Sequence, residues 1–193
     1  FKTSKIPELD KLKPLVSMDG SDSKSLDNML EILSLGGINL FKAIKLLIPP
    51  AWQSTTSNDP DLRAFYEYNA KHMESWDGPA GIVLTDGRYA ACVTDRNGLR
   101  PARYIITNDR HITLASEIGV YDYDEQDVIE KGKLGPGQII AVDTIEGKVL
   151  YSNDIDNMLK KRCPYKEWMD VGAEFMRKII PDKFPKLEIF EDS

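Results

Sequence analysis

The residues best suited to chemistry lie in one short stretch, VTDRNGLRP (residues 93–101), which follows an apolar, β-prone segment. Because arginine guanidinium groups bind carboxylates through two parallel hydrogen bonds, an arginine here either holds Asp95 and shapes the loop or receives the carboxylate of a substrate. An Asn-Gly pair could supply donors to an oxyanion, but between two strands it is more often a tight turn. From the residues alone we expect the structural role for Asp95, Arg96, Asn97, Gly98 and Arg100.

The cysteines and histidines give little support for a nucleophile or a metal site. Cys92 and Cys163 form no CxxC pair, and with only His72 and His111 beside them the sequence predicts no metal-ligand cluster. Cys92 lies in an Ala-rich segment, where a thiol usually fills space and lacks a base to ionise it. No Ser-His-Asp or Cys-His arrangement is predicted. The remaining candidates form a solvated loop or, alternatively, a cation site: Asp122, Asp124 and Glu125.

Three helices are predicted before these strands, from apolar residues spaced along one helical face. The first begins at Ser21-Asp22-Ser23 and stops at Gly36-Gly37, and the second spans residues 40–48 and ends at Pro49-Pro50. These two should form a helical hairpin. The third opens at Asn58-Asp59-Pro60, since proline is well tolerated at a first helical position.

Six strands joined by short turns are predicted after Trp76. Asp86-Gly87 is expected to supply the positive φ angles of a tight two-residue turn between the first pair. Hairpin-linked strands imply antiparallel sheets, so the fold class is α+β, with antiparallel sheets layered with helices. The six segments are residues 79–85, 88–93, 101–107, 111–116, 137–143 and 148–152.

Composition fits one globular domain with a substantial core, because 41% of the 193 residues are apolar and 29% are charged. The net charge of −6 disfavours nucleic acid and anionic membranes as partners, and no apolar run is long enough to span a bilayer. We expect a cytoplasmic protein, or one of the plastid stroma if the source is a plant or alga. Residues 1–16 are interpreted as a connector, 17–152 as the main domain, and 153–193 as a C-terminal helical extension toward a further domain.

Several long blocks together resemble the glutamine amidotransferase domain of the glutamate synthases, and they cover residues 17 to about 168. The blocks are SMDGSDSKSLDNMLE, IPPAWQ, RAFYEYNAKHMESWDGPAGIVLTDGR, DRNGLRPARYIIT, LASEIGV and LGPGQIIAVD. IPPAWQ and RAFYEY do not belong to the related amidophosphoribosyltransferases. The resemblance implies an N-terminal-nucleophile hydrolase (αββα) fold, in which two antiparallel sheets lie between helical layers.

In that family an N-terminal cysteine attacks the side-chain amide of L-glutamine, with its own α-amino group as the base. The ammonia passes to a synthase domain with FMN and an iron-sulfur cluster, where 2-oxoglutarate becomes L-glutamate. This chain departs from the pattern, because it begins with Phe1 and lacks the HNGEIN-like motif whose Asn-Gly pair stabilises the oxyanion. We therefore expect a fold incomplete at the N-terminus, no catalytic residue and no cofactor in this chain, and the remaining amidotransferase segment and the synthase domain as partners.

The resemblance also assigns roles to residues of this chain. Asp22, in GSDSKSL, matches the aspartate that receives the α-ammonium group of glutamine, and we expect it to be held at a helix start by backbone N–H groups. Its alternative role is a plain N-cap. The 95–100 loop is expected to support the pocket without taking part in chemistry, with an Asp95–Arg100 ion pair and Gly98 at positive φ. The alternative function is a noncatalytic interaction or scaffold module.

Overall fold

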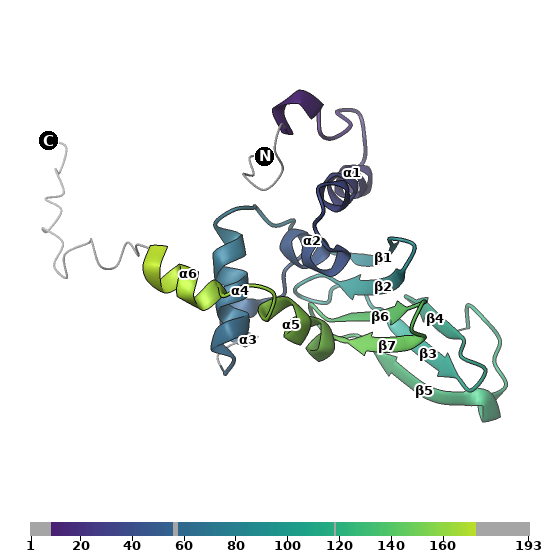
Figure 1. Cartoon of the computed structure of the whole chain (residues 1–193). Helices are drawn as coiled ribbons and strands as arrows, with labels where there is room; N and C mark the ends of the chain where they lie inside the picture. Colours follow the sequence, from purple (N-terminus) through teal and green to yellow (C-terminus); the bar gives the residue numbers. More distant parts are fainter. Residues whose placement is uncertain (1–8, 56–57, 118, 173–193) are drawn as a thin grey trace, which may run out of the picture.

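The computed structural model of the protein describes residues 9–55, 58–117 and 119–172. Figure 1 shows an α+β fold in which two antiparallel sheets lie on one side and most of the helices on the other. Residues 1–8 and 173–193 lie outside the described residues, and with them lie the first part of the expected connector and the end of the expected extension.

The helices predicted from the apolar spacing are all present, and each begins at a capping side chain. Ser21, Asn39 and Asp59 accept N–H groups of the first turns of α1, α2 and α4. These groups have no partner within their own helix, so the caps stabilise the helix starts. Gly36 is the C-cap of α1, and Pro60 occupies the first turn of α4, as predicted. The described helices are η1 (Leu9–Leu12), α1 (Asp22–Leu35), α2 (Leu40–Leu47), α3 (Trp52–Thr55), α4 (Pro60–Ala70), η2 (Glu125–Asp127), α5 (Ser152–Lys160) and α6 (Tyr165–Gly172).

The strands form two sheets, with the orders β1-β2-β6-β7 and β4-β3-β5. Each of the five pairings between described strands is antiparallel, which confirms the prediction made from the short connections. The strands are β1 (Gly81–Thr85), β2 (Tyr89–Thr94), β3 (Arg103–Thr107), β4 (Ile112–Ala115), β5 (Val128–Lys133), β6 (Ile139–Asp143) and β7 (Lys148–Tyr151).

Alternation along the central strands divides the core into two layers. Ala91 and Val93 of β2 face the helices and join a large apolar cluster with α1, α2, α4 and α5. Cys92, between them, faces the second sheet and packs in a smaller cluster with Ile140 and Leu134. Because successive side chains of a strand point to opposite faces, one sheet separates the two clusters. Among the described helices, none packs on the outer face of β4-β3-β5, so this part of the chain has one helical layer (Figure 1).

The sequence interpretation missed one strand and the short helices η1, α3 and η2, and it misplaced one turn. β5 was not predicted, because VIEKGK carries three charged residues and a glycine, which are poor strand formers. Gly132 is nevertheless required there, since a Cβ atom would lie 2.5 Å from the Tyr104 ring. In the first hairpin only Gly87 has a positive φ, +89°, and the Asp86 carboxylate accepts the N–H groups of Arg88 and Tyr89. The two-residue turn is therefore Gly87-Arg88 and not Asp86-Gly87.

The helices expected after Asn153 are α5 and α6, as far as the described residues extend. Ile155 and Leu159 of α5 are buried in the large apolar cluster. Tyr165 of α6 packs edge-on against Phe65 of α4, with ring centroids 5.3 Å apart. These helices therefore belong to the same core as α1, α2 and α4. No described helix is long and apolar enough to cross a membrane.

Candidate functional site

The 95–100 loop is built around the carboxylate of Asp95, which is buried at the end of β2. Four backbone N–H groups donate to it: Ala80 at 3.0 Å, Asn97 at 2.9 Å, Leu99 at 3.0 Å and Arg100 at 3.3 Å. Burial alone would raise the pKa of this carboxyl group, but these donors outweigh burial and hold the pKa below its ordinary value. Asp95 is therefore an ionised structural anchor that fixes the path of the loop.

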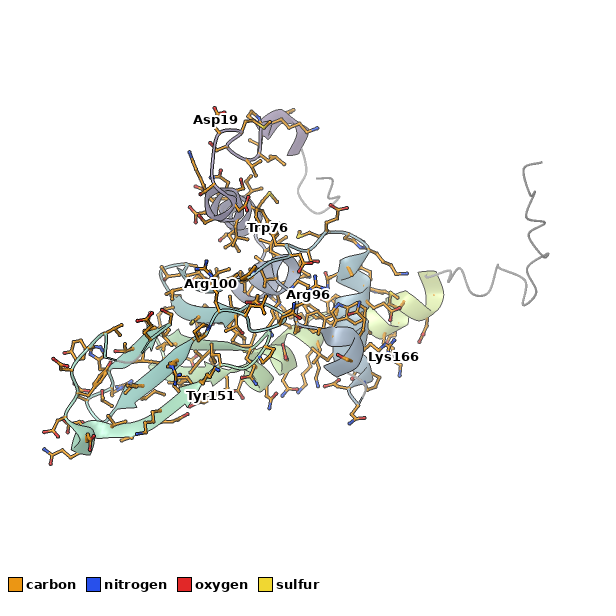
Figure 2. All side chains as sticks on the ribbon, turned by 180° about the vertical axis from the view of Figure 1, so that it is seen from behind. Asp19, Trp76, Arg96, Arg100, Tyr151 and Lys166 are labelled. Atoms are coloured by element: carbon orange, nitrogen blue, oxygen red, sulfur yellow. The ribbon has the colours of Figure 1, made fainter. Side chains whose placement is uncertain are left out.

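The expected ion pair between Asp95 and Arg100 is absent from the described contacts. Arg100 serves Asp95 through its backbone N–H, while its side chain is exposed. Arg96 pairs instead with Asp77, at 3.4 Å. The loop is a tight turn in which the Gly98 N–H donates to the Asp95 carbonyl. This turn directs the N–H groups of Asn97, Leu99 and Arg100 at the Asp95 carboxylate, so the carboxylate is satisfied by backbone donors and not by the Arg100 side chain. In Figure 2, Arg96 and Arg100 lie where the helices meet the sheets.

Gly98 has φ +61°, as predicted for the critical residue of this turn. A second reason for glycine comes from the segment 134–138, LGPGQ, because a Cβ atom on Gly98 would lie 3.1 Å from Pro136. The same segment is tied to the loop by the N–H of Gly137, which donates to the carbonyl of Asp95 at 2.8 Å. The Thr94 hydroxyl donates to the carbonyl of Gly135 at 2.7 Å. Sequence reasoning assigned no role to this turn, although its two glycines around a proline were a usable signal.

Asp22 is exposed in the first turn of α1. The capping oxygen is that of Ser21, which accepts the Lys24 N–H at 3.3 Å, so Asp22 is not the N-cap. Asp22 lines neither of the two cavities described below. Figure 2 shows Asp19, which precedes this helix, near the outer end of the molecule, whereas Arg96 lies at the centre. Glutamine binding by Asp22 stays a prediction.

Among the cavities on the described surface are two that include residues named in the sequence analysis, Arg96 in one and Asp122 and Glu125 in the other. One of about 370 Å³ lies between α2, α3, α4 and the 95–100 loop, and its wall includes Lys45, Trp52, Tyr66, Asn69 and Arg96. The other, of about 850 Å³, is bounded by β3, β4, β5 and the segment that links β4 to η2. The smaller cavity is the one that adjoins the candidate loop.

The cysteine at the centre of the fold is not placed for catalysis. Cys92 is buried between the two sheets, and burial raises the pKa of its thiol to about 11. A thiol with this pKa is almost fully protonated at neutral pH and is a poor nucleophile. Neither histidine is placed to activate it: the ring of His72 contacts the carbonyl of Tyr68 at 3.0 Å, and His111 packs against Tyr121.

No group of three or more His, Cys, Asp or Glu side chains in the described ranges is arranged to hold a metal ion. The acidic segment between β4 and β5 is exposed, as predicted. Asp124 caps η2 by accepting the N–H of Gln126 at 3.3 Å.

The sequence matches one family of known proteins over most of its length. The family model of the class-II glutamine amidotransferases matches residues 1–168. The chain therefore belongs to this family, and its two antiparallel sheets with helices agree with that assignment.

Within this family, the chain is similar to the glutamate synthases. The chain is 44% identical to glutamate synthase [NADH] of Saccharomyces cerevisiae over 189 residues, which is 96% of the chain and 9% of that protein. It is 37% identical to the large chain of glutamate synthase [NADPH] of Bacillus subtilis, over 91% of the chain and 11% of the relative. It is 40% identical to ferredoxin-dependent glutamate synthase 2 of Synechocystis, over 96% of the chain and 12% of the relative. The chain thus spans about a tenth of the length of these curated relatives.

Proposed function

We propose that this chain is part of the glutaminase domain of a glutamate synthase, which releases ammonia from L-glutamine and uses it to convert 2-oxoglutarate into L-glutamate. The observation that carries the proposal is the identity of 37–44% to three glutamate synthases over more than nine tenths of the chain. Since these relatives are named for NADH, NADPH and ferredoxin, the identity favours no single electron donor.

In this proposal the chain supplies the supporting wall of the glutamine pocket. Asp95, ionised and held by four backbone N–H groups, fixes a rigid loop beside the pocket, with Arg96, Asn97, Gly98 and Arg100 on its turn. Asp22, an exposed carboxylate in the first turn of α1, receives the α-ammonium group of glutamine in an ion pair. Replacing Asp22 by Asn should therefore raise the glutamine KM of the complete enzyme about ten-fold or more.

The attacking sulfur comes from a residue outside these 193. The family mechanism needs a thiol and a free α-amino group on one residue, and Cys92 has neither an α-amino group nor an accessible thiolate. The thiolate attacks the side-chain amide carbon of glutamine, ammonia leaves, and water then cleaves the thioester to release glutamate. The residues of this chain bind and orient the substrate during both steps.

Two surfaces support the proposal that the remaining amidotransferase segment packs here. β1 lies at the edge of its sheet, where Val83 is 65% exposed. On the outer face of β4-β3-β5, Ile129 is 67% exposed. Strands with unpaired edges and bare apolar faces are normally covered, and a second helical layer on that outer face would complete an αββα fold.

FMN and an iron-sulfur cluster belong, in this proposal, to the synthase domains of the longer protein. The described part of the chain offers no cysteine cluster for the iron-sulfur cluster. The compartment we propose is the cytoplasm, or the plastid stroma for a plant or algal source.

The test compares the chain with the longer protein that contains it. The longer protein should release ammonia from glutamine and form glutamate from 2-oxoglutarate, whereas the isolated chain should show no turnover above background. An electrophilic glutamine analogue that alkylates the nucleophile should mark a cysteine outside this chain, as read by peptide mass mapping. Labelling of Cys92 or Cys163, or a lack of glutaminase activity in the longer protein, would contradict the proposal.

A further inference from the structure

Lys45 is a buried charge to which the proposed function assigns no role. Lys45, near the end of α2, is 1% exposed, and its ammonium group lies 3.3 Å from the carboxylate of Asp156 on α5. The hydroxyl of Tyr66 on α4 donates to the same carboxylate, at 3.4 Å. Burial lowers the pKa of Lys45, while Asp156 favours its charged form. An ammonium group in the interior is costly even when it is paired with a carboxylate.

The second contact of the ammonium group is the carbonyl oxygen of Gly137, at 3.4 Å. Gly137 lies in the Leu134–Gln138 turn, and its N–H donates in the other direction to the carbonyl of Asp95 at 2.8 Å. One peptide segment thus connects the buried lysine to the residue that anchors the 95–100 loop. The connection crosses from α2 through the turn before β6 to the end of β2.

The Leu134–Gln138 turn packs closely against two neighbouring segments of the chain. Gly137 has φ +65°, and a Cβ atom on it would lie 2.5 Å from Pro50, so the turn packs directly on the chain that follows α2. On its other side Pro136 packs against Gly98. The turn therefore lies between the 95–100 loop on one side and α2 with the segment that follows it on the other. Because protein interiors are close-packed and hardly compressible, a displacement of α2 is transmitted through the turn to the loop.

We infer that Lys45, oriented by Asp156, is a positioning residue that holds the Leu134–Gln138 turn and, through it, the Asp95 loop at the wall of the glutamine pocket. This inference rests on the proposed glutaminase function. Lys45 and Arg96 of the 95–100 loop both line the cavity of about 370 Å³, so the positioning residue and the loop contribute to the same cavity wall.

The chain contains a matched control for this role. Lys160 of α5 pairs with Asp59, the cap of α4, at 2.6 Å, and this ion pair also joins α5 to another helix. No described contact of Lys160 reaches the Leu134–Gln138 turn. If the Lys45 ion pair only stabilises the protein, replacing Lys45 or Lys160 should have similar effects on the glutamine KM. If Lys45 positions the loop, only its replacement should change the loop and the KM.

The experiment uses four forms of the longer protein: wild type, Lys45→Met, the double variant Lys45→Met with Asp156→Asn, and Lys160→Met. For each we would measure Tm, glutaminase KM and kcat, and hydrogen exchange in peptides that cover residues 95–100 and 134–138. Lys45→Met should raise the KM for glutamine about ten-fold, the effect of losing one charge-assisted hydrogen bond. Both peptides should exchange faster.

The double variant separates the effect of Lys45 on the placement of the loop from its effect on the stability of the protein. It removes the buried ammonium group together with its half-buried partner carboxylate, so its Tm should recover toward that of the wild type. Its KM should stay raised and its two peptides should still exchange fast, because the contact with Gly137 is gone. Lys160→Met should change KM less than two-fold.

Recovery of KM in the double variant, or an equal rise of KM in Lys160→Met, would overturn the inference. Absence of glutaminase activity in the wild type would overturn the proposed function instead, and the exchange of the two peptides would still decide whether Lys45 braces the loop.

Discussion

The substitution Gly98→Ala tests the geometry of the candidate loop most directly. Gly98 has φ +61°, in the left-handed region, where an alanine costs about 1–2 kcal/mol. The added Cβ would also lie 3.1 Å from the Cα and Cγ atoms of Pro136, closer than van der Waals contact. Pro136 cannot withdraw easily, because the next residue packs on Pro50. Overpacking of this kind costs about 1–3 kcal/mol, so we expect a total loss of roughly 2–5 kcal/mol in the free energy of unfolding.

Gly87→Ala is the matched control. Gly87 also has a positive φ, +89°, but a Cβ atom there meets nothing within 4 Å. The loss should therefore be limited to the backbone term, about 1–2 kcal/mol. The gain from restricting the unfolded chain is about 0.4–1 kcal/mol for both substitutions and cancels in the comparison.

The assay is urea unfolding of both variants and the wild type, followed by circular dichroism and fluorescence. With a slope of about 1–3 kcal/mol per M, the transition midpoint of Gly98→Ala should lie roughly 1 M below that of Gly87→Ala. Equal midpoints for the two variants would refute the reasoning, because they would show that Pro136 does not confine Gly98.

Three further predictions concern ionisable groups. Asp95→Asn should lower the free energy of unfolding by roughly 3 kcal/mol at pH 7, because an amide cannot accept from all four N–H groups. The folded-state pKa of Asp95 lies below its ordinary value of 3.8, so its contribution is present above that pH and is lost as the pH falls through the folded-state pKa. The difference from wild type should therefore shrink in acid unfolding curves, and a constant difference would contradict the role of the charge. Arg88 holds the pKa of Asp143 at about 2, against 3.8 for the free group, so stability from this pair should be lost between those two pH values. An Arg88→Gln variant should lack that step in acid titration, and an unchanged step would count against the pair. Cys92 should resist a thiol reagent at pH 8 in the folded protein and react on unfolding, since burial raises its pKa to about 11. Prompt modification without unfolding would show that the thiol is accessible.

Much of the fold follows from signals that are local in the sequence. Ser21, Asn39 and Asp59 cap helices whose apolar residues repeat along one face, and each helix forms where the pattern predicts it. Gly98 occupies a positive φ, as an Asn-Gly turn between strands requires. Caps, turns and periodicity involve residues within a few positions of one another, so the sequence alone suffices to predict them.

The contacts that define the candidate site are only partly local. Asp95 is held by the N–H of Ala80 and by its own turn, and the arginine that seemed its natural partner contributes only a backbone group. β5 forms a strand because it pairs with β3, on the side of β3 that faces away from β4. The charged sequence of β5 gives no strand signal.

From the sequence alone follow α1, α2, α4, the helical character after Asn153, six of the seven described strands, their antiparallel pairing and the resemblance to the family. The tertiary structure decided which groups meet: the burial of Lys45 against Asp156, and its link through Gly137 to the Asp95 loop. The physical reason is that a buried polar group takes whichever partner the packed backbone brings within about 3 Å, and that choice depends on segments far apart in the chain.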